Sequence, residues 1–178
     1  INLNGQLKAL FGSWEQAIGT LLSAISSTPT SHLNQTVQKN LDLLGNVMQA
    51  TGNALIADST KQISLNKIGN QIQAIGNSTV IVGLIIQFNK TTTNTKLDIQ
   101  GNLLQAIGSG MSLPDLLNEN NVSSKDVYLL LASLLQLIGN ALQALGSIKE
   151  LKKQDGQNIN FVGSWIQAIG ASIQAFAS

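Results

Sequence analysis

Residues that could do acid–base, nucleophilic or metal chemistry are few and scattered in this sequence. The single histidine, His32, lies in "PTSHLN" with no second histidine or carboxylate near it, which favours a surface or helix-capping role over catalysis. A Ser-His-acid triad can assemble from distant positions, but no nucleophile elbow occurs. Cysteine is absent, which excludes disulfides, thiolate metal sites and a cysteine nucleophile.

The acidic residues do not form a recognisable site either. Glu15 and Asp98 stand singly near repeated motifs, whereas acid–base catalysis needs groups that converge on one substrate, so we expect both on solvated faces. Asp115, Glu119 and Asp126 cluster in "LPDLLNENNVSSKD", but without the spacing of an EF-hand loop. Glycine-rich segments lack the Lys-Ser/Thr pair and the preceding strand of a phosphate loop. The sequence therefore predicts no catalytic, cofactor-binding or metal-ligating residue, and we expect a non-enzymatic protein without a cofactor.

Composition narrows the partners that the chain can have. It has 178 residues, enough for one domain or two small ones, and only 11% of them are charged. The net charge is +1 and the longest basic run is Lys152-Lys153. Nucleic-acid binding normally needs a basic patch that neutralises phosphates, so we expect no nucleic-acid partner. The first residue is Ile1 rather than Met, which leaves open what preceded it.

One octapeptide, G-[NS]-x-x-Q-A-x-G, recurs along the whole chain, and internal repeats of this kind decide the fold class. The copies read GSWEQAIG at Gly12, GNVMQATG at Gly45, GNQIQAIG at Gly69, GNLLQAIG at Gly101, GNALQALG at Gly139 and GSWIQAIG at Gly163. We predict a helix-packing role for the motif residues Gly12, Gln16, Gly19, Gly45, Gln49, Gly52, Gly69, Gln73, Gly76, Gly101, Gln105, Gly108, Gly139, Gln143, Gly146, Gly163, Gln167 and Gly170.

Each copy sits inside an apolar pattern with helical spacing. Around the last copy, Ile159, Val162, Ile166, Ile169 and Ile173 recur at steps of three and four, which predicts one face of a helix. Alternatively, [NS]-x-x-Q is a capping box and the second glycine a C-cap, so that each copy is a helix of about six residues. The apolar phase runs through both glycines and favours continuous helices, even in the strand-like "TVIVGLII" at 79–86. We predict helices at roughly 4–26, 33–57, 62–88, 96–111, 124–152 and 158–177.

These helices predict an all-α fold, either a six-helix bundle or a short helical array. Successive copies start 33, 24, 32, 38 and 24 residues apart, an order that suggests duplication of a three-helix unit. We therefore expect two tandem halves, 1–90 and 91–178, that join at "NKTTTNTK" and form one compact unit.

The motif also predicts how the helices pack. Its two glycines lie about 20° apart on a helical wheel, and the fourth and seventh positions form an apolar stripe beside them. We expect this stripe in the core, with the second position facing away from it. A mid-helix glycine costs about 1 kcal/mol relative to alanine, so close approach of a neighbouring backbone must offset that cost. The alternatives are a polar lumen lined by glutamines and a face for self-assembly.

The first and last copies differ from the others by carrying tryptophan at the third motif position, Trp14 and Trp165. Terminal repeats that differ from inner ones are typical of arrays. We predict that the two tryptophans close the structure, either by packing the first helix near the last or by meeting across a subunit contact.

Three functions remain on this basis. The first is a structural or interaction protein that self-associates through Gly- and Gln-lined helix faces. The second is a membrane-active protein, pore-forming or interfacial, because the charge-free runs 127–148, 68–89 and 156–178 are long enough to span a bilayer. These runs contain Asn, Gln and Ser, however, and lysine is not gathered at their ends. The third is a carrier of an apolar ligand.

The strings "LFGSWEQAIGTLLSAISSTP" and "LDLLGNVMQATGNALIAD" resemble an uncharacterised repetitive protein family of Bacillus-type bacteria, which repeats the same octapeptide along most of the chain. The resemblance implies a bacterial source and a domain of unknown function. It transfers no catalytic or binding residue to this chain, and it leaves cytoplasmic, spore-associated and cell-surface locations open. Copy two departs from the pattern with Thr51, where other copies have Ile or Leu.

Overall fold

The computed structural model describes residues 3–29, 33–86, 91–117 and 123–178. Its helices are α1 (Leu3–Ser27), α2 (Gln35–Asp58), α3 (Leu65–Ile85), α4 (Thr91–Met111), α5 (Leu113–Leu117), α6 (Ser124–Leu151) and α7 (Gln157–Ala177). The described residues contain no strand, so the all-α prediction is confirmed, including the stretch from Thr79 to Ile85. The short α5 lies between the predicted helices 96–111 and 124–152, where we predicted no helix.

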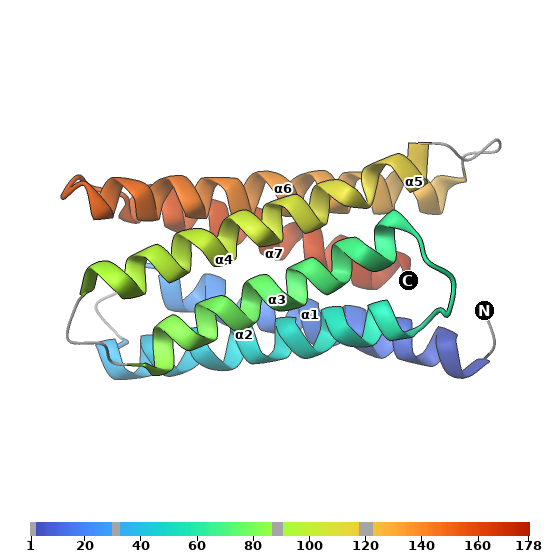
Figure 1. The fold of residues 1–178 in the computed structure, drawn as a ribbon, viewed down its shortest axis with the longest axis horizontal. Coiled ribbons are helices and arrows are strands. Elements are labelled where there is room, and N and C mark those ends of the chain that lie inside the picture. Colours follow the sequence, from blue (N-terminus) through green and yellow to red (C-terminus); the bar gives the residue numbers. More distant parts are fainter. Residues whose placement is uncertain (1–2, 30–32, 87–90, 118–122) are drawn as a thin grey trace.

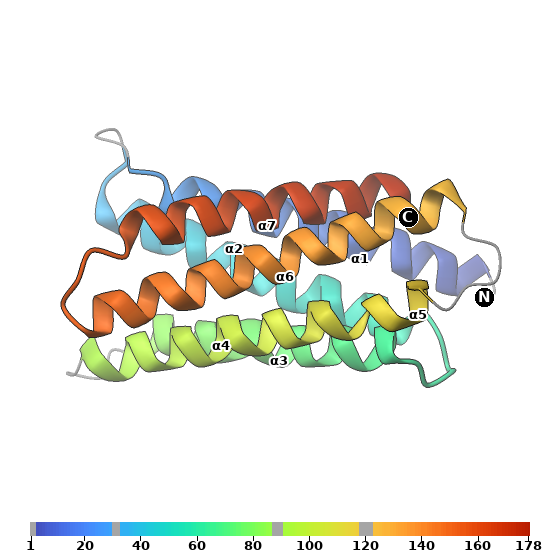
Figure 2. The same cartoon turned by 90° about the horizontal axis from the view of Figure 1, so that it is seen from above.

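The six long helices form three antiparallel hairpins, α1/α2, α3/α4 and α6/α7, that lie side by side along the long axis of the molecule (Figures 1 and 2). In Figure 1 the α6/α7 pair lies above the α1/α2 pair, with α3 and α4 in front of both. Contacts of α2 with α3, α4 with α6 and α7 with α1 close the bundle. The expected boundary at residues 90/91 falls between α3 and α4, which pack together as one hairpin.

Two hairpins are held together where motif glycines face one another. A Cβ atom added to Gly19 or to Gly45 would lie 2.6 Å from the carbonyl oxygen of the other residue, and Gly12 and Gly52 face each other in the same way. In α3/α4, Gly69 lies against Gly108 and Gly76 against Gly101. No side chain fits at this spacing, because real Cβ atoms do not approach within 3.0 Å of other heavy atoms.

The third hairpin uses the same contact in a different register. In α1/α2 and α3/α4 the first glycine of one copy faces the second glycine of its partner, whereas Gly139 of α6 faces Gly163 of α7, the first glycine of each copy. Gly146 therefore meets Gly156 and Asn160, and Gly170 meets the backbone of Ala132. Two small residues outside the motif thus complete the contact in this hairpin.

The interior of the bundle is polar, which reverses the predicted orientation of every helix. The second motif position, expected to face away from the core, is buried in all six copies, as Ser13, Asn46, Asn70, Asn102, Asn140 and Ser164. The seventh position, expected in the core, is exposed, with 46% of Ile18, 58% of Ile75 and 51% of Ile169 accessible. The physical reason is the glycine contact: it brings the helices so close that small side chains and amides fit between them, while the branched aliphatic side chains of the described chain, apart from Val80, are exposed or half-buried.

The apolar residues of the described chain are correspondingly on the outside. Its buried hydrophobic residues are alanines apart from Val80, and no leucine, isoleucine or aromatic residue is among them. Large exposed apolar side chains occur on all six long helices, for example Leu10, Val47, Leu103 and Leu134. Burial of apolar area is the main driving force for folding in water, and this chain gains little of it by closing the bundle.

Both terminal-repeat tryptophans join the first helix to the last. The ring of Trp14 in α1 meets Phe176 of α7 edge to face, with 5.0 Å between ring centroids and 77° between planes. At the opposite end of the contact, Trp165 Nε1 of α7 donates to Thr28 Oγ1 at 3.0 Å. The two motif copies therefore close the bundle within one chain.

Candidate functional site

The motif glutamines project into the centre of the bundle, where a connected amide network links four helices. Gln167 of α7 donates through Nε2 to Gln49 Oε1 of α2 at 2.9 Å and to Gln105 Oε1 of α4 at 3.2 Å. Gln143 of α6 donates in turn to Gln167 Oε1 at 2.8 Å. Three of these four side chains are buried, and their mutual hydrogen bonds satisfy much of the polar capacity that burial would otherwise leave unpaired.

A second chain of hydrogen-bonded amides lies nearer the end of the bundle where α1, α3 and α6 begin. Gln16 of α1 donates to Gln136 Oε1 of α6 at 2.7 Å, and Gln136 donates to Gln174 Oε1 of α7 at 2.6 Å. Gln136 and Gln174 lie outside the glutamine position of the motif. The remaining motif glutamine, Gln73, lines a small polar pocket of about 40 Å³ at this end.

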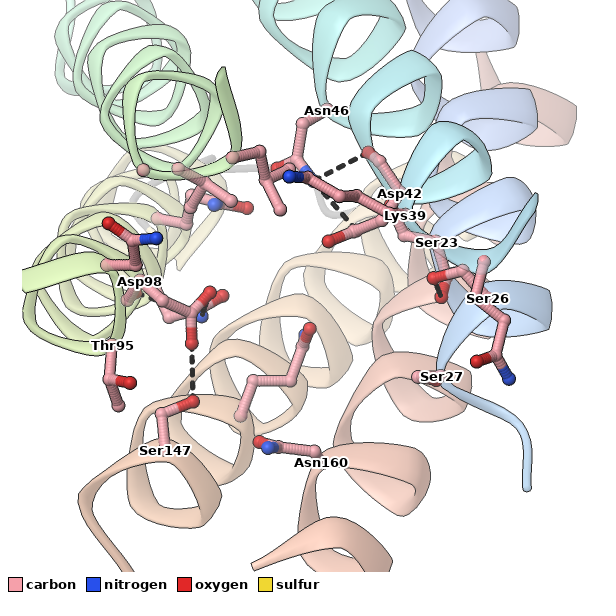
Figure 3. Close-up of a pocket in the computed structure, with 18 of the residues that line it drawn as sticks. Ser23, Ser26, Ser27, Lys39, Asp42, Asn46, Thr95, Asp98, Ser147 and Asn160 are labelled. Atoms are coloured by element: carbon pink, nitrogen blue, oxygen red, sulfur yellow. Dashed lines mark hydrogen bonds between the residues drawn. The ribbon is translucent and has the colours of Figure 1, made fainter. Parts of the chain in front are cut away.

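A larger polar cavity of about 410 Å³ opens at the end of the bundle where α2, α4 and α7 begin (Figure 3). Four of the six motif glutamines line it, so it reaches inward as far as the amide network. Its other polar and charged lining residues are Ser23, Ser26, Ser27, Gln38, Lys39, Asp42, Asn46, Asn94, Thr95, Asp98, Asn102, Ser147, Glu150 and Asn160. Val80, Gly83 and Leu84 complete the lining, so the wall carries both polar and apolar surface.

Two helices present the same Asp–Asn pair to this cavity. Asn46 Nδ2 donates to Asp42 Oδ1 and to the Asp42 carbonyl oxygen, both at 2.9 Å. Asn102 Nδ2 makes the same two bonds to Asp98, both at 3.1 Å. Ser147 Oγ of α6 also donates to Asp98 Oδ2. Figure 3 shows Asp42 and Asp98 on opposite walls of the cavity.

The surroundings of these carboxylates favour their neutral forms. Burial raises the pKa of Asp42 to about 7, and the negative charge of Asp98 adds to the increase, against hydrogen bonds from Ser23 and Asn46. Burial likewise raises the pKa of Asp98 to about 6, with a contribution from Glu150. Both side chains keep some exposed surface because the cavity reaches them. The one ion pair among the described residues joins Lys8 to Asp58, so neither Asp42 nor Asp98 has a lysine partner.

The other acidic residues considered from the sequence do not converge. Asp115 accepts a hydrogen bond from the Asn66 amide at 2.8 Å, and Asp126 forms a capping box with Ser123 at the start of α6. Glu15 is half-buried on α1, and its Oε2 has no hydrogen-bond partner. His32 and Glu119 lie outside the described residues. Within the described ranges no group of three or more His, Cys, Asp or Glu residues could hold a metal ion.

The cavity corrects the expectation for Asp98 and adds a residue that we did not predict. Asp98 faces the cavity rather than a solvated surface, and Asp42 is its counterpart on α2. The signal was present in the sequence as D-x-x-G-N, which occurs as "DLLGN" in copy two and "DIQGN" in copy four. In copy three Asn66 takes the place of the aspartate and accepts a hydrogen bond from Asn70 at 2.6 Å.

Comparison with known proteins identifies the family of this chain. Residues 7–175 match the Family of unknown function (DUF6944), so the chain belongs to that family. No curated protein and no solved structure matches the sequence. The family assignment therefore adds no activity to the geometry of the bundle.

Proposed function

We propose that the protein is a non-enzymatic helical bundle that resides in a lipid bilayer, with its apolar outer surface against lipid and its amide-lined interior shielded from it. The observation that carries this proposal is the reversal of the usual distribution, with glutamine, asparagine, serine and glycine inside and large apolar side chains outside. In hydrocarbon, helix association relies on small-residue contacts and interhelical hydrogen bonds, which are the two interactions that hold this bundle together.

The extent of the apolar surface favours lipid over a second protein copy. Exposed large apolar residues occur on every long helix and so surround the bundle, whereas a dimer contact covers one side of each copy. The Gly- and Gln-lined faces through which we expected self-association are occupied within the chain. Further copies would have to meet through the same apolar surface that lipid covers.

The distribution of charge also fits a slab-like environment. Every charged residue in the described chain except Glu15 lies in a connecting segment, in α5 or within about two turns of a helix end, with the second turns of α2 and α4 carrying Lys39 and Lys96. The charge-free stretch 127–148 of α6 is about 33 Å long, close to the roughly 30 Å hydrocarbon core of a bilayer. The stretches are shorter in α2, where residues 43–57 span about 22 Å, and in α4, where residues 99–111 span about 20 Å, lengths that snorkelling lysines and local thinning accommodate. Asp42 and Asp98 lie just outside these stretches.

The mean hydropathy of a helix underestimates how apolar its outward face is, because it averages the outward and inward faces. Among the described residues, Ser124–Leu151 is the one helix long and apolar enough to cross a membrane, with a mean hydropathy of 1.6 over its best 18-residue window. One such helix is weak support by itself, since core helices of water-soluble proteins also qualify. The proposal depends instead on which faces are apolar, and the inward amides of the other helices lower their averages without meeting lipid.

Flotation of the full chain with phosphatidylcholine vesicles tests the proposal. We expect the protein to co-float, to resist extraction at alkaline pH and to be released by detergent. The variant Leu103→Lys/Ile169→Lys places charge on two outward mid-helix positions, 43% and 51% exposed, and should reduce co-flotation severalfold. A protein that stays in the aqueous fraction as a discrete oligomer would overturn the proposal in favour of self-association.

A further inference from the structure

We infer that the cavity between α2, α4 and α6 binds a small organic cation with N–H donors, a primary amine or diamine, held between the carboxylates of Asp42 and Asp98. This inference is independent of the lipid environment, because it concerns the interior of the bundle.

The cavity is large enough for a small molecule, and helices of the bundle surround it. Its volume of about 410 Å³ falls in the range of small-molecule sites, which begins near 300 Å³. Six helices contribute to its wall, and the Gln49–Gln167–Gln105 network forms part of its lining. The cavity is therefore open at the end of the bundle and extends inward between the helices as far as the glutamine network.

The charged residues that face the cavity are mainly acidic. Asp42, Asp98 and Glu150 line it together with a single basic residue, Lys39. The described chain forms no salt bridge between Lys39 and any of the three acids. Glu150 accepts a hydrogen bond from Asn160 at 2.9 Å, whereas the hydrogen bonds to Asp42 and Asp98 come from neutral amides and hydroxyls. A bound cation would supply the positive partner that these two carboxylates lack.

Unpaired side-chain oxygens in the cavity wall determine which groups of a ligand it can bind. The side chains of Asn46 and Asn102 are 5% and 6% exposed and line the cavity. Each uses its Nδ2 group on the aspartate four residues earlier. Two further asparagines of the lining, Asn94 and Asn160, each have an Oδ1 atom that is buried without a hydrogen-bond partner. The open capacity near the aspartates thus consists of acceptor oxygens, which calls for a ligand rich in N–H donors.

The arrangement of the two aspartates favours an organic cation over a bare metal ion. Calcium and magnesium need six or more oxygen ligands close together, whereas two aspartates on opposite walls of a wide cavity leave a metal underligated. A diamine can instead place one ammonium group at each carboxylate. The raised pKa of Asp42, about 7, and of Asp98, about 6, reflects repulsion and burial that a bound cation would relieve.

Isothermal titration calorimetry of the purified full chain in detergent micelles tests this site, with 1,4-diaminobutane as the probe. We expect saturable binding at pH 8, where both aspartates are ionised, and at least tenfold weaker binding at pH 5, where they are protonated. The neutral isostere 1,4-butanediol, and sodium or potassium chloride at equal concentration, should not bind detectably.

Isosteric variants locate the effect. Asp42→Asn and Asp98→Asn should each weaken diamine binding at least tenfold, while Asp155→Asn, an exposed aspartate at the same end of the bundle, should leave it unchanged. Asparagine is compatible with the helix at this position, since Asn66 and Asn70 already form the equivalent pair in α3. Equal binding of diamine and diol, affinity unchanged in both variants, or no heat from the wild-type chain would each overturn the inference. Flotation measured in parallel separates such a result from failure of the bilayer proposal.

Discussion

Gly139 of α6 and Gly163 of α7 lie against each other so closely that a Cβ atom on Gly139 would be 2.6 Å from the Gly163 carbonyl oxygen, and one on Gly163 would be 2.7 Å from the Gly139 carbonyl oxygen. Equivalent contacts occur in the other two hairpins. They determine which residues fit between the helices, because the space left beside touching backbones holds alanine, serine and the planar amides, with Val80 beside Gly101 as the one buried branched aliphatic residue in the described chain. The polar interior and the apolar exterior follow from the same contact.

Gly139→Ala should therefore destabilise the bundle, although alanine is the better helix former by about 1 kcal/mol. The added methyl group would collide with backbone atoms of Gly163 and Gln167, which cannot rotate away. We expect a net loss of about 2 kcal/mol and a larger loss for Gly139→Leu, measured as a fall in melting temperature of roughly 4–8 °C for alanine.

Gly110→Ala is the matched control for this variant. A Cβ atom on Gly110 would meet one atom within 4 Å, the side-chain Cδ1 of Leu137 at 3.0 Å, and that side chain can shift. The melting temperature should stay the same or rise slightly. Equal effects of the alanine substitutions at 139 and 110 would contradict the packing argument.

The helices themselves could be predicted from the sequence, whereas the face that each turns inward could not. The apolar period around Ile159, Ile166 and Ile173 marks one face of α7 correctly as continuous and helical. The usual interpretation of this periodicity assigns the apolar face to the core, because it takes the protein to be surrounded by water. The close backbone approach at the motif glycines was predicted, but its consequence was not drawn: it places the neighbouring Ser164 and Gln167 in the interior and leaves the apolar stripe outside.

The cavity could be anticipated only in part. Asp98 stood out as an isolated acid, and its role depends on Asp42, which lies 56 positions earlier in the sequence and faces Asp98 across the cavity. The repeated D-x-x-G-N string can be found in the sequence. The sequence alone does not show that α2 and α4 run in the same direction and place their aspartates at the same end of the bundle. That relation comes from the hairpin order of the closed bundle.

The glutamine network should depend most on its central member. Gln167→Leu removes one acceptor and two donations and leaves Gln49, Gln105 and Gln143 each short of a partner. We expect a loss of about 2–3 kcal/mol in the free energy of unfolding, from chemical denaturation in detergent. Gln143→Leu removes one hydrogen bond to Gln167 from a half-buried side chain and should cost about 1 kcal/mol. A larger loss of unfolding free energy for Gln143→Leu than for Gln167→Leu would show that Gln167 is not the central member of the network.

The raised pKa values of Asp42 and Asp98 predict that stability falls as the pH rises. The folded chain binds more protons than the unfolded chain between the ordinary aspartate pKa of 3.8 and the raised values of about 7 and 6, so the contribution of these groups is fully present below pH 4 and lost by about pH 7. The melting temperature in the absence of ligand should drop by several degrees from pH 5 to pH 8, since 1 kcal/mol corresponds to about 2–4 °C at this chain length.

The double variant Asp42→Asn/Asp98→Asn provides the control for the pH series, because it keeps the shape of both side chains and removes their titration. Its melting temperature should vary much less between pH 5 and pH 8 than that of the wild-type chain. A wild-type melting temperature that rises across this interval would show that the two carboxylates are stabilised in their charged forms, contrary to their surroundings in the bundle.

Glu15 offers the most direct test of what surrounds the helices. It occupies the fourth motif position, where the other copies carry Met48, Ile72, Leu104, Leu142 and Ile166. It is also the one acidic or basic residue in the middle of a described helix, and its Oε2 atom is buried without a partner. Glu15→Ile should raise the free energy of unfolding by about 1–2 kcal/mol and increase the co-floating fraction.

Glu15→Gln separates charge from size in this test. It removes the carboxylate without adding apolar surface, so it should give an intermediate gain in flotation if lipid lies against α1. An increase in stability for both variants with no change in flotation would show that the carboxylate is merely an unpaired buried group.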